Sequence, residues 1–218
     1  TIDGKGFLYY KGELGKQLSE VFTNKKVWTF EDNKLPVLKN ISNEQDNALP
    51  SYFEGHLFEG EGTEQNPYII SSYDDLAKLS DLTNSKGETF SGKFFKQTAD
   101  IIYYDYYNSW IAIKDFEGTY DGNGKTITNV LGIFNNLKGT VKNLSVENIY
   151  YRNDVTERDF GVLANKTDGN AKIINCHIKG VNLNVTNGFR IGLIVGSLKN
   201  GGLIENCSAE GSIDGKST

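Results

Sequence analysis

Three segments in the second half of the chain decide the fold: GIFNNLKGTVKNLSVENI (132–149), GVLANKTDGNAKIINCHIKGV (161–181) and GLIVGSLKNGGLIENCSAEGS (192–212). Each opens with a glycine and two apolar residues, and each carries an asparagine at a matched position. These asparagines are Asn143, Asn175 and Asn206, so the spacings are 32 residues (175 minus 143) and 31 residues (206 minus 175). A constant period of this length is the signature of a repeat architecture.

A unit of this size that holds only short strands cannot bury its apolar face alone, whereas stacked units bury one another. Residues at matched positions would then lie about one strand spacing, roughly 4.8 Å, apart. The sequence therefore predicts an all-β fold, a parallel β-solenoid with internal rows of matched side chains. The expected rows are Val141, Ile173 and Ile204; Leu144, Cys176 and Cys207; and Val146, Ile178 and Ala209.

The two cysteines fall at equivalent positions of neighbouring units. We interpret them as small buried apolar side chains. A disulfide between them is the alternative, although directly stacked parallel neighbours have poor geometry for one. Metal binding is the least favoured alternative, because the chain has two histidines and the side chains of Cys176 and His177 should point to opposite faces.

The stretch SSYDDLAKLSDLTNSKG (71–87) predicts a helix over about 72–85. Ser71 or Ser72 is a suitable N-cap, and the two aspartates that follow favour the helix dipole. Leucines recur at three-residue spacing, which gives one apolar stripe, and a glycine ends the helix. An open solenoid end is an exposed sheet edge, so we expect this helix to cap it.

The first part of the chain has a different character. KVWTFEDNKLPVLKNI (26–41) predicts two short strands around a charged turn, and SNEQDNALP (42–50) has the composition of a linker.

Residues 60–218 resemble a known family. GTEQNPYIISSYDDLAKLSDL, FSGKFFKQTADI and GTYDGNGKTITNV, followed by the glycine-led repeats, resemble the GLUG-motif β-helix modules of large bacterial surface proteins. Such modules occur in adhesins and in the non-catalytic N-terminal regions of IgA1-protease-like proteins. The resemblance implies a right-handed parallel β-helix over 50–218 with the helical cap. It also implies that residues 1–49 are the closing segment of a preceding module plus a linker. The repeats at Gly132 and Gly161 lack the second glycine of the motif, and the repeat at Gly192 has it one residue late.

Asp121-Gly122-Asn123-Gly124 looks like the start of a calcium loop. An EF-hand loop needs an oxygen ligand at its fifth position, glycine at its sixth and an acid at its twelfth, and here those are Lys125, Thr126 and Gly132. The flanking residues alternate as in strands, so we interpret the stretch as a turn between two strands. A calcium site of another kind remains the alternative.

Composition excludes several classes of function. The chain has 218 residues, a formal net charge of −5 and no block of lysine and arginine, so nucleic acid is not an expected partner. No apolar run reaches transmembrane length, so we expect no membrane insertion by this chain. It has no methionine and begins with Thr1, so we expect an excised or processed piece of a longer protein, with any signal peptide or anchor left behind.

No catalytic spacing stands out. Serine–histidine–aspartate and HExxH patterns and phosphate-binding glycine loops are absent from the sequence, and the candidate acids Asp100, Asp105, Asp115 and Asp121 fall in separate turns. We expect no cofactor, no metal and no enzymatic activity. The alternative is a β-helix carbohydrate-active enzyme, which would need an acidic groove on one face.

The aromatic stretch IIYYDYYNSWIAI (101–113) is the best binding candidate. Its aromatic residues are too numerous for strand alternation to bury them all, and exposed tyrosine and tryptophan suit sugar or protein surfaces. The candidates are Tyr103, Tyr104, Tyr106, Tyr107 and Trp110. The alternative is a flank that its own loop covers.

The resemblance implies an extracellular or surface-attached bacterial protein, and together with the residues above it leads us to expect a non-catalytic module that binds a host or matrix protein or a glycan. A substrate-positioning domain of a secreted IgA1-protease-like metallopeptidase is the second hypothesis.

Overall fold

The computed structural model describes residues 58–104, 110–148, 159–185, 190–199 and 201–215, and the backbone of residues 28–29, 37–38 and 153–155. The chain forms two compact units, Thr1–Glu61 and Gly62–Thr218. The expected domain boundary at residues 49–50 lies outside the described residues.

The first unit contains one described pair of strands, β1 (Trp28–Thr29) and β2 (Val37–Leu38). They pair antiparallel, with Trp28 opposite Leu38. Both lie where the sequence predicts two short strands.

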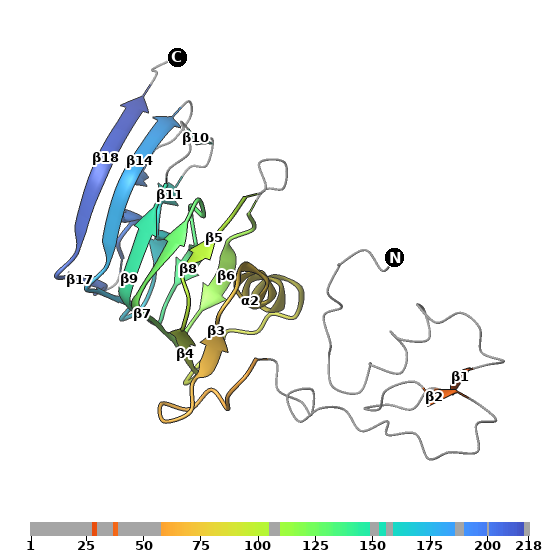
Figure 1. The fold of residues 1–218 in the computed structure, drawn as a ribbon. Helices are drawn as coiled ribbons and strands as arrows, with labels where there is room; N and C mark the ends of the chain where they lie inside the picture. The colour runs from red at the N-terminus through yellow and green to blue at the C-terminus, as the bar shows by residue number, and fades with distance from the viewer. Residues whose placement is uncertain are drawn as a thin grey trace. The chain divides into compact units, whose positions relative to one another are not determined.

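The second unit consists of parallel strands and one helix (Figure 1). Its strands are β3 (Tyr68–Ile70), β4 (Phe94–Gln97), β5 (Ile101–Ile102), β6 (Ile113–Phe116), β7 (Thr119–Thr128), β8 (Phe134–Leu137), β9 (Thr140–Glu147), β10 (Asn153–Val155), β11 (Asp159–Gly161), β12 (Ala164–Thr167), β13 (Lys172–Ile174), β14 (His177–Val185), β15 (Arg190–Gly192), β16 (Val195–Ser197), β17 (Leu203–Glu205) and β18 (Ser208–Gly215). The described part is thus mostly β-structure, in agreement with the expected all-β class.

The strands form three parallel sheets, and each sheet grows in chain order. The ten-stranded sheet runs β3-β4-β7-β9-β14, with β10 and β18 paired to β14, β5 paired to β7, and β13 and β17 continuing from β9. The four-stranded sheet runs β6-β8-β12-β16, and β11 pairs with β15. The chain therefore returns to each sheet at regular intervals and adds its next strand beside the previous one.

The register follows the repeat period. Ile173 of β13 pairs with Val141 of β9 on one side and with Ile204 of β17 on the other. Ile178 of β14 lies in the same way between Val146 and Ala209. Upstream of the repeats, Tyr120 and Phe95 continue the Val141 row on β7 and β4. Side chains of this row fill the core, because Phe95, Tyr120, Val141 and Ile173 are all at most 1% exposed.

The helix α2 (Tyr73–Ser85) begins where the sequence predicts. The Ser72 hydroxyl accepts a hydrogen bond from the Asp75 backbone at 3.2 Å, which makes Ser72 the N-cap. Its leucine stripe is fully buried, with Leu76 and Leu79 at 0% exposure.

The helix packs against β6, the first strand of the four-stranded sheet. The Ser80 hydroxyl donates to the Ile111 carbonyl, and the Thr83 hydroxyl accepts from the Lys114 backbone at 2.9 Å. The helix therefore makes hydrogen bonds with backbone groups in and next to β6. In the described part of the chain, β6 is the end strand of its sheet, and no earlier strand pairs with it. Within that part, no helix is long and apolar enough to cross a membrane.

Candidate functional site

We call the described residues of the aromatic stretch, 101–104 and 110–113, the aromatic flank. The helix α2 holds two of its rings in place. Tyr73, the first residue of α2, stacks on Tyr103 with ring centroids 4.6 Å apart and planes 21° apart. The Trp110 ring meets Tyr73 edge-on at 6.2 Å, and its indole nitrogen donates to the Gly132 carbonyl at 3.2 Å. Offset stacking and a satisfied indole N–H fix these rings in place.

The described residues of the flank differ in exposure. Tyr103 and Trp110 are half-buried, whereas Tyr104 is 68% exposed and Ile111 is 65% exposed. Tyr106 and Tyr107 lie outside the described residues. The flank thus combines rings locked against the helix with two apolar side chains that face solvent.

The stretch around Asp121 is not a turn between two strands, as the sequence interpretation has it, but a bulge inside the single strand β7. Asp121 pairs with Lys142 of β9, and pairing resumes with Lys125 opposite Leu144, so three residues lie opposite one. Asn123 and Gly124 have positive φ values of 52° and 71°, which bends the backbone without ending the strand. The strand continues because both of its halves pair with β9.

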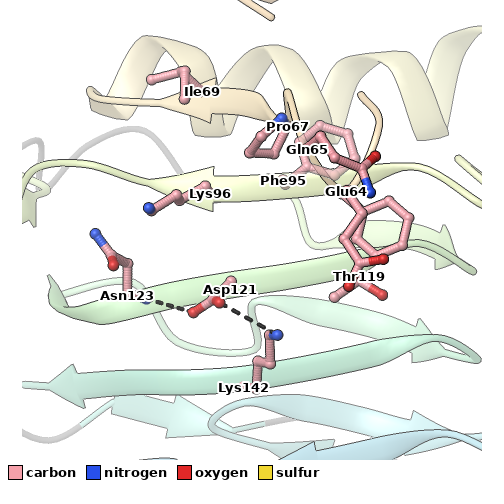
Figure 2. Close-up of a pocket in the computed structure, with 11 residues that line it drawn as sticks. Glu64, Gln65, Pro67, Ile69, Phe95, Lys96, Thr119, Asp121, Asn123 and Lys142 are labelled. Carbon is pink, nitrogen blue, oxygen red and sulfur yellow. Dashed lines mark hydrogen bonds and ion pairs between the residues drawn. The ribbon is translucent and has the colours of Figure 1, made fainter. Parts of the chain in front are cut away.

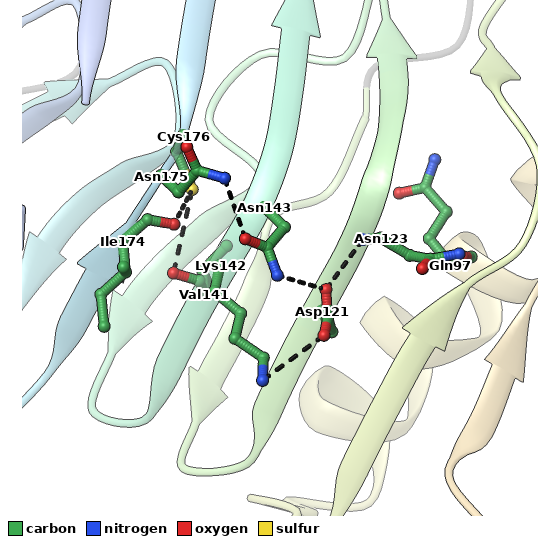
Figure 3. A network of polar contacts seen from close by, with 9 residues as sticks. All are labelled: Gln97, Asp121, Asn123, Val141, Lys142, Asn143, Ile174, Asn175 and Cys176. Carbon is green, nitrogen blue, oxygen red and sulfur yellow. Dashed lines mark hydrogen bonds and ion pairs between the residues drawn. The ribbon is translucent and has the colours of Figure 1, made fainter. Parts of the chain in front are cut away.

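A row of side-chain amides runs across the sheet from this bulge (Figure 3). Asn206 donates to Asn175 at 3.2 Å, Asn175 donates to Asn143 at 2.9 Å, and Asn143 donates to an Asp121 carboxylate oxygen at 3.0 Å. All three asparagines have φ values of 52–53°, in the left-handed region that asparagine tolerates. We call Asn143, Asn175 and Asn206 the asparagine row.

Sequence reasoning used these asparagines to align the repeats and assigned them no structural role. The sequence did contain a signal for this role. Asparagine and glycine are the residues that favour left-handed backbone, so an asparagine that recurs at one repeat position indicates a left-handed position there.

The Asp121 carboxylate is held by several donors. The Asn123 backbone donates to it at 2.8 Å, and Lys142 Nζ lies 3.4 Å away. Partial burial acts to raise the pKa of Asp121, but the bonds from Asn143 and Asn123 and the Lys142 charge outweigh it, so the pKa lies below the ordinary value. Asp121 is therefore a fixed, ionised acceptor.

Comparison with known families gives a match at the end of this row. The GLUG motif family matches residues 187–214, which include β15, β16, β17 and most of β18. The chain contains a GLUG motif. Within it, Arg190 of β15 makes a bidentate pair with Asp159 of β11, with bonds of 2.6 and 2.8 Å.

A comparison with curated proteins gave no match. Among solved structures, the chain is similar to a crystal structure described as a "putative immunoglobulin A1 protease" from Bacteroides ovatus. The identity is 23%, the TM-score is 0.47, and the match covers 72% of this chain and 61% of that one. This chain therefore corresponds to less than two thirds of that chain's length.

The cysteine of the GLUG motif, Cys207, and its partner Cys176 are free thiols. Cys176 is fully buried and its backbone N–H points at the Cys207 sulfur at 3.3 Å. Burial raises the pKa of Cys176 to about 12, so it stays protonated near neutral pH. In the described part of the chain, no cluster of three or more histidine, cysteine or acidic side chains is arranged to hold a metal ion.

The candidate acids upstream of the GLUG motif take part in structural contacts. Asp100 accepts from the Thr126 backbone at 2.8 Å, and Asp115 accepts from Asn136 at 2.7 Å and lies 3.4 Å from Lys138. Asp105 lies outside the described residues. Each described candidate acid thus stabilises a neighbouring strand.

Proposed function

We propose that this chain is a non-catalytic right-handed parallel β-helix module of a bacterial surface or secreted protein, and that it binds a host or matrix protein or a glycan. Parallel sheets that grow in chain order, a helix at their first edge and a GLUG motif at their last strands support the architecture. Repeat modules of this kind present long rigid surfaces, and such surfaces suit binding.

The aromatic flank carries the proposal for binding. Tyr104 and Ile111 are both about two-thirds exposed, next in sequence to Tyr103 and Trp110, which the helix holds. Aromatic and apolar side chains on a rigid support lose little entropy on binding, which is the usual property of binding hot spots.

A non-catalytic role is favoured by the acids. Asp100, Asp115 and Asp121 accept hydrogen bonds from residues of neighbouring strands. Asp115 and Asp121 each also form an ion pair with a lysine. These contacts give the carboxylates a structural role. A glycosidase needs a different arrangement, in which one carboxyl group stays protonated near a second carboxylate.

The test is a binding screen with immobilised glycans and host proteins, including matrix proteins and immunoglobulin A1. The variants are Tyr104→Ala and Ile111→Ala, and the matched control is Leu198→Ala, which removes another exposed apolar side chain, 51% exposed, from β16's end of the molecule. We expect a loss of at least about tenfold in affinity for the flank variants, since truncation of a hot-spot side chain costs about 2 kcal/mol or more, and about 1.4 kcal/mol already corresponds to tenfold.

Equal affinity in the flank variants and in Leu198→Ala would contradict the role of the flank. Selective binding of immunoglobulin A1 would favour the substrate-positioning hypothesis over a general adhesive module.

A further inference from the structure

A concave site lies among residues that are not part of the aromatic flank. The segment 64–67 and the strands β3, β4, β7 and β9 line a pocket of about 470 Å³ (Figure 2). Its lining is Glu64, Gln65, Pro67, Ile69, Phe94, Phe95, Lys96, Thr119, Asp121, Asn123 and Lys142. We call it the strand groove.

The polar floor of the strand groove follows from the parallel register. Lys96 of β4 pairs with Asp121 of β7, which pairs with Lys142 of β9. Their neighbours Phe95, Tyr120 and Val141 point into the core, so alternation places the three charged side chains on the outer face. A cation, an anion and a cation thus stand on consecutive strands.

Of these three charged side chains, Lys142 and Asp121 form an ion pair with each other, and Lys96 forms none with the described residues. Lys142 lies 3.4 Å from Asp121, while Lys96 is exposed and has no ion-pair partner among the described residues. Asp121 keeps a fixed position through the donors from Asn143 and Asn123. The groove therefore offers a preorganised acceptor beside a free donor.

The other wall is partly apolar. Pro67, Ile69 and Phe94 are half-buried and line the same pocket. Such a wall can cover an apolar ligand face, and the few polar groups can fix its orientation.

The charges of the strand groove balance. Lys96 and Lys142 are opposed by Asp121 and Glu64, so two cations meet two anions among the lining residues. A charged ligand would gain no net attraction from this set. A ligand with several hydroxyls can instead donate to the carboxylates and accept from the ammonium groups.

We propose that the strand groove binds a neutral sugar residue, with Lys96 and Asp121 contacting its hydroxyls and the Pro67–Phe94 wall covering its C–H face. A sugar ring has one apolar face and a rim of hydroxyls, which is the arrangement that this lining complements. The pocket volume falls within the roughly 300–1,000 Å³ typical of small-ligand sites. The site shares no residue with the aromatic flank, so it stands independently of the flank's function.

The experiment titrates the isotope-labelled chain with the methyl glycosides of glucose, galactose, mannose and N-acetylglucosamine, followed by backbone amide shifts. We expect shifts confined to the segment 64–67 and to β3, β4, β7 and β9 for at least one glycoside. Methyl glucuronide serves as the anionic comparison, and we expect it to bind no more tightly than the best neutral glycoside.

Lys96→Ala is the test variant and Lys172→Ala its matched control. Both lysines are exposed on outward positions of the same sheet, but Lys172 of β13 does not line the pocket. We expect about a tenfold loss of affinity in Lys96→Ala, as for a charged hydrogen bond worth roughly 1.5 kcal/mol, and no change in Lys172→Ala. Tyr104→Ala should also leave this binding unchanged.

The proposal is overturned if no glycoside shifts these strands, if both lysine variants behave alike, or if the glucuronide binds most tightly. If a glycoside does bind, two further experiments distinguish a host glycan from a bacterial polysaccharide as the source of the sugar. A host glycoprotein is compared before and after enzymatic deglycosylation, and a purified bacterial polysaccharide is compared with it.

Discussion

The two ends of the strand stack differ in burial, although they continue the same rows. At the end where α2 packs, Leu76 and Leu79 are fully buried, and so are Tyr120 and Val141 on the strands that follow. At the other end every residue of β17 and β18 is exposed, and Ile213 is 41% exposed.

The row of Val141, Ile173 and Ile204 shows this difference in burial most clearly. Ile173 is 0% exposed, while Ile204, the same residue type at the same repeat position, is 37% exposed. The difference is that Ile173 has a paired strand on both sides and Ile204 has a described neighbour on one side only. Burial here is a property of having two neighbours, as expected when stability comes from contacts between adjacent repeats.

The largest expected effect comes from truncating the two isoleucines. We expect Ile173→Ala to lower the free energy of unfolding by about 2–5 kcal/mol, because it opens a cavity in a closed core. Ile204→Ala should cost roughly 1 kcal/mol, because it removes a side chain that is only partly withdrawn from water. Urea unfolding of both variants measures this, and equal losses would show that the end strands are as well packed as the middle ones.

The thiols test the same contrast by chemistry. Cys176 is fully buried and its pKa is raised to about 12, whereas Cys207 is partly exposed. We expect iodoacetamide at pH 8 to alkylate Cys207 at least about a hundredfold faster, because reaction needs an accessible thiolate. Mass spectrometry of the digested protein follows both sites. Similar rates would mean that the end of the stack opens together with its interior.

The asparagine row gives a smaller effect. Asn175 lies between two amide partners, and Asn206 has one described amide partner. We expect Asn175→Ala to cost about 2–3 kcal/mol, from left-handed backbone strain and lost hydrogen bonds, and Asn206→Ala about 1 kcal/mol less.

Replacing either asparagine with glycine separates the two causes. Glycine tolerates the φ value of about 53° but makes no amide bond, so Asn175→Gly should be about 1 kcal/mol milder than Asn175→Ala. If the two variants unfolded at the same urea concentration, backbone strain would play no part.

The smallest effect concerns Asp121 and pH. Its pKa is depressed in the folded state, so its stabilising contribution is present above the ordinary pKa of 3.8 and is lost as pH falls through the folded value. We expect Asp121→Asn to destabilise the protein at pH 7 and to make less difference at pH 2–3. A loss that is the same at both pH values would assign the effect to packing and not to charge.

The rows and the helix were readable from the sequence for physical reasons. Ile173 pairs with Val141 and Ile204 because strands that stack in register must repeat at a nearly constant spacing, and the spacing is visible. The helix could be placed because Ser72 and the leucine stripe of α2 are local signals. The bulge at Asp121 was misread, because asparagine and glycine with left-handed backbone occur both in turns and inside bulged strands.

The strand groove could not be predicted in this way. Glu64, Lys96, Asp121 and Lys142 come from a loop and three strands, at spacings set by connections of different length. Their outward positions become neighbours only once the register is known. The stacking of Tyr103 on Tyr73 could not be predicted for a related reason, since it joins two segments 30 residues apart.

The chain-order growth of the sheets also bears on how the molecule is made. The helix precedes the repeats in the chain, and in each sheet most later strands pair with strands that precede them. During synthesis, each emerging repeat can therefore pair with a strand that is already present and need not wait for distant sequence. Assembly can then proceed in one direction along the chain.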